Sequence, residues 1–272
     1  MTNQKLQYYC SNCKGILRET ESEMGISNVT EPCPFCGSLL SESLKTRRPA
    51  QKVEKIAFQQ ASRVPKLGID IRKVDSAIPF LSTDQKVALV GHHSQKIIER
   101  LAVRAQMPAR YGGLDSHVVI VDGGNSSDPY LCIDFARQYG LDPRQVLSKI
   151  ISSRAFTVHQ LEHLVSHELS YIIKKYGAKL VILSDILAMF SDTSLDRTDA
   201  RQLLNSISKS ISKIKECLVI ASISKPTAYD DAILKSFDRT IRLSESDGLI
   251  TVDLGSNNYT IRESDLEVIP RR

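Results

Sequence analysis

Four cysteines near the start of the chain have the type and spacing of metal ligands. Cys10 and Cys13 form one C-x2-C pair, and Cys33 and Cys36 form a second pair nineteen residues further on. Four thiolates in this pattern complete a tetrahedral zinc site, which leaves no open position for catalysis. The chain starts without a secretory signal, so zinc is favoured over disulfides. The sequence therefore predicts a zinc ribbon over residues 1–45, which needs its metal to fold.

Two further groups of potential ligands have simpler interpretations. Cys132 and Cys217 lie in apolar runs and are predicted to be core residues. His159, His163 and His167 recur every four residues on a predicted helix and could share one face that binds a metal. The apolar stripe of that helix leaves the histidines on its flank, which favours a surface without a metal.

The segments that follow two predicted strands are the places where nucleotide chemistry is expected. Gly91 begins a turn that reads Gly-His-His-Ser-Gln-Lys before a helix. A P-loop reads GxxxxGK[ST], because glycines expose backbone N–H groups to phosphates, lysine meets the outer phosphates and the hydroxyl holds magnesium. Only the first glycine of this pattern is present. Asp185 ends the apolar run KLVILSD, as the carboxylate of a Walker B strand does, and could order a magnesium-bound water.

The elements that must position these residues alternate along the chain. Strands are predicted at 87–90, 118–122, 149–152, 180–185, 218–222, 239–243 and 249–254, with helices at 95–106, 130–139, 158–176 and 197–214. This alternation predicts an α/β fold with a mainly parallel sheet flanked by helices. Ligands of such sheets bind at the carboxyl ends of the strands, which here are Gly91, Asp122, Asp185 and Ser222.

The composition limits the classes of protein to which this chain can belong. The chain has 272 residues, is 42% hydrophobic and 25% charged, and carries a formal net charge of +5. These values fit a globular protein with a sizeable core and exclude disorder, collagen and a disulfide scaffold. No stretch is long and apolar enough for a membrane span, so we expect a cytoplasmic protein without a membrane partner. A basic segment of nine Lys or Arg against three acids, over residues 45–75, could contact phosphates or be a solvated linker.

Three long stretches resemble the archaeal and eukaryotic RadA-type recombinase family. They are LAVRAQMPARYGGLDSHVVIVDGGN from Leu101, FARQYGLDPRQVLSKIISSRAFTVHQLEHL from Phe135 and KYGAKLVILSDILAMF from Lys175. The resemblance covers most of residues 56–260 and implies a RecA-like core at residues 76–272, preceded by the ribbon and a linker at 46–75. It also suggests a prokaryotic, archaeal-type origin. A ribbon before a RecA-like core is similar in architecture to bacterial RadA.

The sequence departs from the family pattern where the ATPase groups would be. An ungapped alignment from Leu101 backwards puts the family's GKT on His93, Ser94 and Gln95, so the lysine position is a serine. The family's catalytic glutamate falls on Gly124. A degenerate nucleotide site would consist of Gly91, Ser94, Gln95 and Asp185. We therefore expect no catalytic residue and no ATPase activity, and the sequence leaves open whether ATP and magnesium bind at all.

The resemblance also implies contacts with partners. The family's two DNA-binding loops correspond to SDTSLDRTDARQ and SKPTAYDDAILK, with Arg197, Arg201, Lys225 and Tyr229 as candidate contacts, and the linker adds Arg47, Arg48 and Lys52. Phe58 and Ala61 form an FxxA segment, which in the family inserts its Phe into a neighbouring molecule. The alternative is that Phe58 packs on its own core.

Three functions are compatible with these features. The first is a catalytically degenerate RadA/RecA-like paralogue in homologous recombination and DNA repair, which binds DNA (preferably single-stranded), the active recombinase or its own copies. The second is a residual DNA-dependent ATPase with an altered nucleotide loop. The third is a regulator that binds only protein. Salt-dependent DNA binding and its response to ATP would distinguish them.

Overall fold

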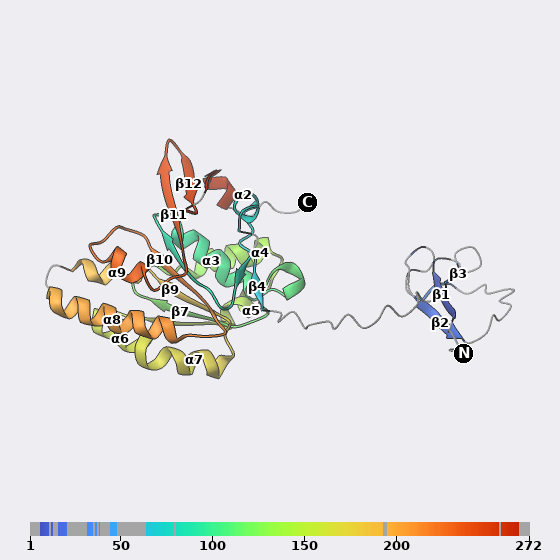
Figure 1. Ribbon diagram of the computed structural model, residues 1–272, viewed down its shortest axis with the longest axis horizontal. Helices are drawn as coiled ribbons and strands as arrows, with labels where there is room; N and C mark the ends of the chain where they lie inside the picture. The colour runs from blue at the N-terminus through green and yellow to red at the C-terminus, as the bar shows by residue number, and fades with distance from the viewer. Residues whose placement is uncertain are drawn as a thin grey trace, which may run out of the picture. The chain divides into compact units, whose positions relative to one another are not determined.

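The computed structural model divides the chain into two compact units, Met1–Ser62 and Arg63–Arg272. It describes residues 6–10, 12, 16–20, 32–34, 36, 38, 44–47, 64–78, 80–192, 195–255 and 257–266. In the first unit, β1 (Leu6–Cys10) pairs antiparallel with both β2 (Ile16–Thr20) and β3 (Leu44–Arg47), and the strand order is β2-β1-β3 (Figure 1). Cys10, the first residue of the first cysteine pair, ends β1.

The second unit is built on an eight-stranded sheet of order β13-β12-β11-β6-β10-β9-β7-β8. The strands are β6 (Lys86–Val90), β7 (Val118–Asp122), β8 (Ile150–Arg154), β9 (Leu180–Ser184), β10 (Leu218–Ile223), β11 (Arg239–Ser246), β12 (Leu249–Asp253) and β13 (Asn258–Arg262). The strands from β11 to β8 are parallel, and β12 and β13 add an antiparallel meander. The predicted α/β class and mainly parallel sheet are confirmed.

Helices cover both faces of this sheet (Figure 1). The longer ones are α3 (Ser94–Arg104), α4 (Pro129–Gln138), α7 (Leu169–Tyr176) and α8 (Arg197–Lys213), and the shorter ones are α2 (Arg72–Asp75), α5 (Pro143–Ser148), α6 (Val158–His163) and α9 (Asp230–Leu234). Short 3-10 turns lie at Ala109–Tyr111 (η1), Ala188–Ser191 (η3) and Glu263–Leu266 (η4). No helix in the described ranges has the length and apolarity to span a membrane.

The predicted single helix at 158–176 is wrong in one respect. A π-helical segment, η2 (Leu164–Glu168), separates α6 from α7. The apolar side chains continue across it, with Leu161, Val165 and Leu169 all buried, so the sequence periodicity does not reveal the change of helix type.

Alternating side chains of the central strands divide the core into two layers. On β9, Leu180 and Ile182 pack with α3 on one face, whereas Val181 and Leu183 pack with α6 and α8 on the other. All four are fully buried, as expected for a parallel sheet covered on both faces. Cys132 and Cys217 are each 2% exposed, which confirms them as core residues.

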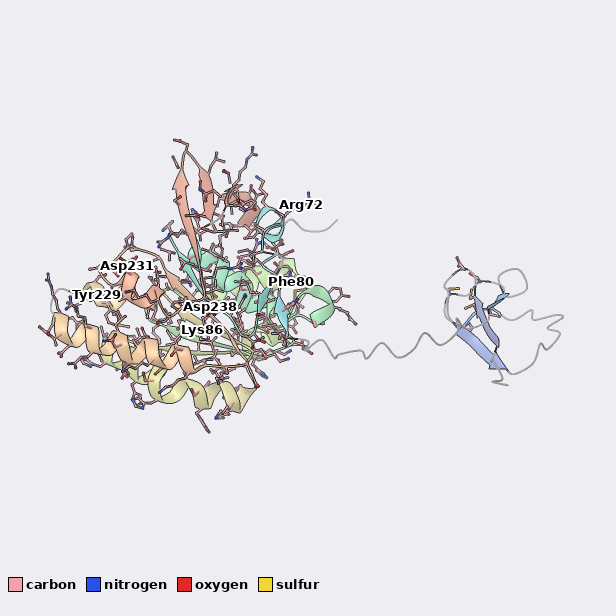
Figure 2. The ribbon with its side chains drawn as sticks, in the orientation of Figure 1. Arg72, Phe80, Lys86, Tyr229, Asp231 and Asp238 are labelled. Atoms are coloured by element: carbon pink, nitrogen blue, oxygen red, sulfur yellow. The ribbon has the colours of Figure 1, made fainter. Side chains whose placement is uncertain are left out.

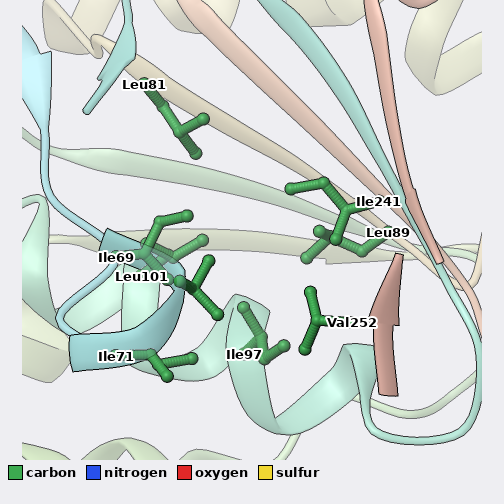
Figure 3. Close-up of a pocket in the computed structure, with 9 residues that line it drawn as sticks. Ile69, Ile71, Leu81, Leu89, Ile97, Leu101, Ile241 and Val252 are labelled. Carbon is green, nitrogen blue, oxygen red and sulfur yellow. The ribbon is translucent and has the colours of Figure 1, made fainter. Parts of the chain in front are cut away.

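Residues 64–78 belong to the core unit, which begins before the expected boundary at residue 76. β4 (Lys66–Leu67) pairs with β5 (Leu81–Ser82), and Ile69, Ile71 and Val74 join the core. These three side chains and six others enclose an apolar space of about 10 Å³ against α3 and the sheet, lined also by Leu81, Leu89, Ile97, Leu101, Ile241 and Val252 (Figure 3). That is about the space of one water, and its lining has no polar partner for a water.

Candidate functional site

The parallel strands bring the predicted site residues to one edge. β7, β9, β10 and β6 are neighbours in that order, so Asp122, Asp185, Ser222 and Gly91 lie at adjacent strand ends. The four strand ends named from the sequence thus share one edge of the sheet. The contacts below show what this edge can do.

The turn after β6 is short and tightly packed. Only Gly91, His92 and His93 separate the end of β6 from the start of α3 at Ser94. Gly91 has φ +124°, its N–H donates to Ile223 O (2.8 Å), and a Cβ there would lie 2.0 Å from Leu243 O. A P-loop places six residues between its first glycine and the Ser/Thr that follows its lysine, whereas two residues separate Gly91 from Ser94.

Ser94 and Gln95 point into the protein. Ser94 is fully buried, and its Oγ has no hydrogen-bond partner among the described residues. Gln95 Oε1 accepts hydrogen bonds from Ser126 Oγ (3.2 Å) and Ser184 Oγ (3.1 Å), while Gln95 Nε2 donates to Glu99 (2.9 Å). Gln95 therefore binds Ser184 on β9 and Ser126 in the segment after β7, whereas Ser94 Oγ makes no such bond.

Glu99 is a buried carboxyl group that the sequence reasoning did not single out. It is 2% exposed, and burial raises its pKa although hydrogen bonds from Cys132 Sγ (2.9 Å), Asp128 N (3.0 Å) and Gln95 oppose the shift. Its signal in the sequence is a carboxylate within the apolar face of α3, next to Ile98. Glu99, on α3, accepts hydrogen bonds from Cys132 and from Asp128 and thereby links α3 to α4.

Asp122 is satisfied by the chain that follows it. Its carboxylate accepts hydrogen bonds from Gly124 N, Ser126 N and Ser127 N at 3.0–3.3 Å, and Arg154 Nε lies 3.3 Å from Oδ2. At 2% exposure, this group shapes the turn after β7.

Asp185 is held in a similar way. Its carboxylate accepts from Ser224 N (2.9 Å) and Ser224 Oγ (2.8 Å), and its own N–H donates to Ser222 Oγ (2.8 Å). Its φ of +47° lies in the left-handed region. Gly124 packs directly against it, because a Cβ on Gly124 would lie 2.5 Å from Asp185 Cβ. A glutamate side chain at residue 124 does not fit this arrangement.

Lysine is absent from the phosphate position of the turn. Lys96, the nearest lysine in that segment, lies one turn into α3 with Nζ 3.5 Å from Glu263 Oε1. His93 Nε2 lies 2.8 Å from Glu245 Oε2 on β11. Lys96 thus contacts the 3-10 turn η4, and His93 contacts β11.

The segments that resemble DNA-binding loops carry both signs of charge. Arg197 and Arg201 are exposed on the first two turns of α8, and Lys225 is exposed after β10. Five acids lie beside them: Asp192, Asp196, Asp199, Asp230 and Asp231. Hydrogen bonds from Asp199 N and Thr198 N lower the pKa of Asp196, which keeps this N-cap ionised. Tyr229, the remaining candidate contact, is partly buried, and its ring centre lies 5.8 Å from that of the buried Phe190.

Three of the four predicted zinc ligands converge in the amino-terminal unit. The Sγ atoms of Cys10, Cys33 and Cys36 lie within 4.8 Å of one another, and those of Cys10 and Cys36 are 3.8 Å apart. Tetrahedral ligands at a Zn–S distance of about 2.3 Å are separated by about 3.8 Å, so the spacing fits zinc. Asn12 Nδ2 donates to Cys36 Sγ (3.8 Å) and to Ser38 Oγ (2.7 Å), which orients the second pair. Cys13 lies outside the described residues.

The other predicted ligands and contacts are more dispersed. In the described part of the chain, no histidine takes part in a convergent group of three metal-capable side chains. His159, His163 and His167 are exposed, and His163 Nε2 lies 3.3 Å from Glu168. Arg47 is the last residue of β3. Arg48, Lys52, Phe58 and Ala61 lie outside the described residues.

A comparison with protein families agrees with this geometry. Residues 91–225 match the Rad51 family model, from the turn after β6 to the residue after Ser224. The match covers every strand end described above and, with the strand order, confirms that the core is RecA-like.

Proposed function

From a core that carries a domain of the Rad51 recombinase family, we propose that this chain is a recombinase paralogue that acts in DNA recombination and repair without hydrolysing ATP. It binds DNA, the active recombinase or both, and works as an accessory protein in the cytoplasm. The packing of the strand-end edge is the observation that carries the proposal.

Phosphoryl transfer requires a cradle of backbone N–H groups, a cation at the outer phosphates and a positioned carboxylate. Here the turn after Val90 has three residues, the lysine position is the buried Ser94, and the glutamate position is Gly124 packed on Asp185. The N–H and the Oγ of Ser224 each donate a hydrogen bond to the carboxylate of Asp185. Each group that would serve the reaction is either missing or already bound to the protein.

We also propose that Cys10, Cys13, Cys33 and Cys36 hold one zinc ion. The 3.8 Å separation of Cys10 and Cys36 supports this assignment. Four thiolates would close the site, so the metal would hold β1 to the second cysteine pair and take no part in a reaction. The DNA contacts expected from this proposal include Arg47, Arg48, Lys52, Arg197, Arg201 and Lys225. Phe58 and Ala61 would provide the contact with a recombinase or a second copy.

Fluorescence anisotropy of a labelled single-stranded oligonucleotide tests the function in the full, zinc-loaded chain. We expect binding that weakens with salt and is unchanged by ATP and magnesium, together with no ATP hydrolysis above a buffer blank. Magnesium-dependent hydrolysis that Asp185→Asn abolishes would contradict the proposal and favour a residual ATPase. Binding to a Rad51-family recombinase in the absence of any DNA binding would favour a purely protein-binding regulator.

A further inference from the structure

Aromatic and basic side chains gather at the opposite edge of the sheet, where the parallel strands begin. We call this the amino edge. Among the described residues, four of the seven exposed large hydrophobic side chains lie on segments that lead into these strands: Phe80, Tyr111, Tyr171 and Tyr176. Figure 2 labels Phe80 apart from Tyr229 and Asp231, which follow the carboxyl end of β10.

A basic side chain lies over each of these four rings. Lys66 Nζ lies 5.9 Å from the ring centre of Phe80, and Arg110 Cζ lies 5.0 Å from that of Tyr111. Lys175 Nζ lies 5.9 Å from Tyr171 and 5.3 Å from Tyr176. The other two such pairs in the described residues, Arg100 with Phe135 and Arg104 with Tyr139, involve buried arginines. Exposed cation–aromatic pairs are thus confined to the amino edge within the described chain.

The most concentrated part of this edge is the last two turns of α7, which we call the α7 platform: Tyr171, Lys174, Lys175 and Tyr176, all exposed. The ring of His117 lies 5.9 Å from that of Tyr176 and extends the platform to the start of β7. Lys179 Nζ donates to Leu114 O (3.1 Å), which links the platform to the segment after Tyr111. These contacts join α7 to the start of β7 and to the segment before it.

Charge distinguishes this edge from the one that resembles the family's DNA-binding side. Segments at the amino edge carry ten basic residues, Lys66, Lys86, Arg110, Lys149, Lys174, Lys175, Lys179, Lys213, Lys215 and Arg239, against the four acids Asp84, Asp115, Glu216 and Asp238. Around Arg197, Arg201 and Lys225, by contrast, the five acids listed above outnumber the bases. A polyanion is attracted to the first surface and repelled by much of the second.

We propose that single-stranded nucleic acid binds at the amino edge, with bases stacked on Tyr171 and Tyr176 and phosphates at Lys174 and Lys175. Alternating aromatic faces and ammonium groups match a strand that presents bases and phosphates in turn. This inference rests on the DNA-binding part of the proposed function and assigns it a surface.

Anisotropy with a labelled oligothymidine of about 20 nucleotides tests the assignment in the full chain. We expect K174E/K175E to weaken binding at least about tenfold at low salt and to reduce the slope of log K against log salt by about 1.4, because each lost phosphate contact removes about 0.7. Y171A should weaken binding about tenfold, whereas Y171F, which keeps the ring, should remain within about twofold. R242E/R262E, which reverses two exposed charges on β11 and β13, is the control with the same change of charge and should also remain within about twofold.

A pattern in which R197E/R201E abolishes binding and the platform variants do not would overturn the inference and leave the proposed function standing. Absence of DNA binding by the unaltered chain would overturn the inference and the DNA-binding part of the function together. Displacement of the oligonucleotide by polyglutamate at equal charge, with no effect of Y171A, would show a surface for acidic protein segments and would likewise overturn it.

Discussion

Gly124 and Asp185 follow different strands, but their close packing limits which side chain fits at each position. The missing side chain at residue 124 makes room for Asp185, whose left-handed backbone turns its carboxylate toward Ser224. This contact is a direct reason why the glutamate expected from the family is not accommodated. The interaction between Gly124 and Asp185 can be measured as a coupling energy.

Gly124→Ala places a Cβ in contact with Asp185 and should lower the free energy of unfolding by about 1–3 kcal/mol. In an Asp185→Gly background the contacting atoms are absent and the left-handed conformation is tolerated, so most of that loss should disappear. Urea unfolding of the four proteins in this double-mutant cycle gives the coupling. An equal loss in both backgrounds would show that the two residues are not in contact.

Glu99 makes stability depend on pH in a defined direction. Burial raises its pKa above the ordinary value of 4.5, so the folded protein holds this proton more tightly than the unfolded chain. The contribution of the group to stability is complete below that ordinary value and is lost as the pH rises through the folded pKa. Glu99→Gln cannot ionise, and the variant should therefore gain stability relative to the parent protein as the pH rises from about 4 to about 8. Urea midpoints of both proteins at each pH measure this gain, and a difference independent of pH would refute the assignment.

At the level of elements, aspartate caps start three helices of the core. Asp128, Asp142 and Asp196 accept hydrogen bonds from the first turns of α4, α5 and α8. Pro129 and Pro143 follow two of them at the first helical position, where proline costs no hydrogen bond. The pairs Asp-Pro at 128 and 142 thus mark where the helices begin.

Asp142→Ala removes the acceptor for Arg144 N (2.8 Å) and should cost about 0.5–2 kcal/mol of folding free energy. Asp142→Asn keeps an acceptor oxygen and should cost much less, because asparagine is an equally good N-cap. Thermal unfolding of both variants compares them directly. Equal destabilisation by alanine and asparagine would mean that the charge of Asp142, and not the cap, is what matters.

The sequence predicts elements well where the pattern is local. The central strands β7, β9 and β10 are apolar runs, and all seven predicted strands are present. β13 was missed because Asn258–Arg262 is a short polar edge strand, and the basic residues of the linker concealed Ile69, Ile71 and Val74, which join the core. Asp185 could be predicted from its strand, whereas its bond to Ser224 depends on β9 lying beside β10. The periodicity of the sequence does not predict contacts between distant segments.

At the scale of the whole molecule, the chain is two units that are stabilised by different means. The core has two extensive apolar layers on either side of its sheet. The first unit, Met1–Ser62, is too small for such a core, and its three described cysteines converge instead.

Removal of the proposed zinc should therefore affect only the first unit. After treatment with a strong chelator, we expect rapid proteolysis within residues 1–62 and an unchanged calorimetric transition for the core. Cys33→Ser should reproduce the chelated state and respond no further to chelator. A lower core transition after chelation would show that the two units stabilise each other.

The packing of the turn after β6 also bears on how such a protein can change over generations. A lysine at residue 94 would enter a fully buried position, and a glutamate at residue 124 would collide with Asp185. Each of these two residues introduced alone is therefore expected to lower stability. In evolutionary terms the packing constrains both positions: a lysine at residue 94 or a glutamate at residue 124 can be accommodated only together with substitutions of neighbouring residues, so selection for folding preserves the present residues.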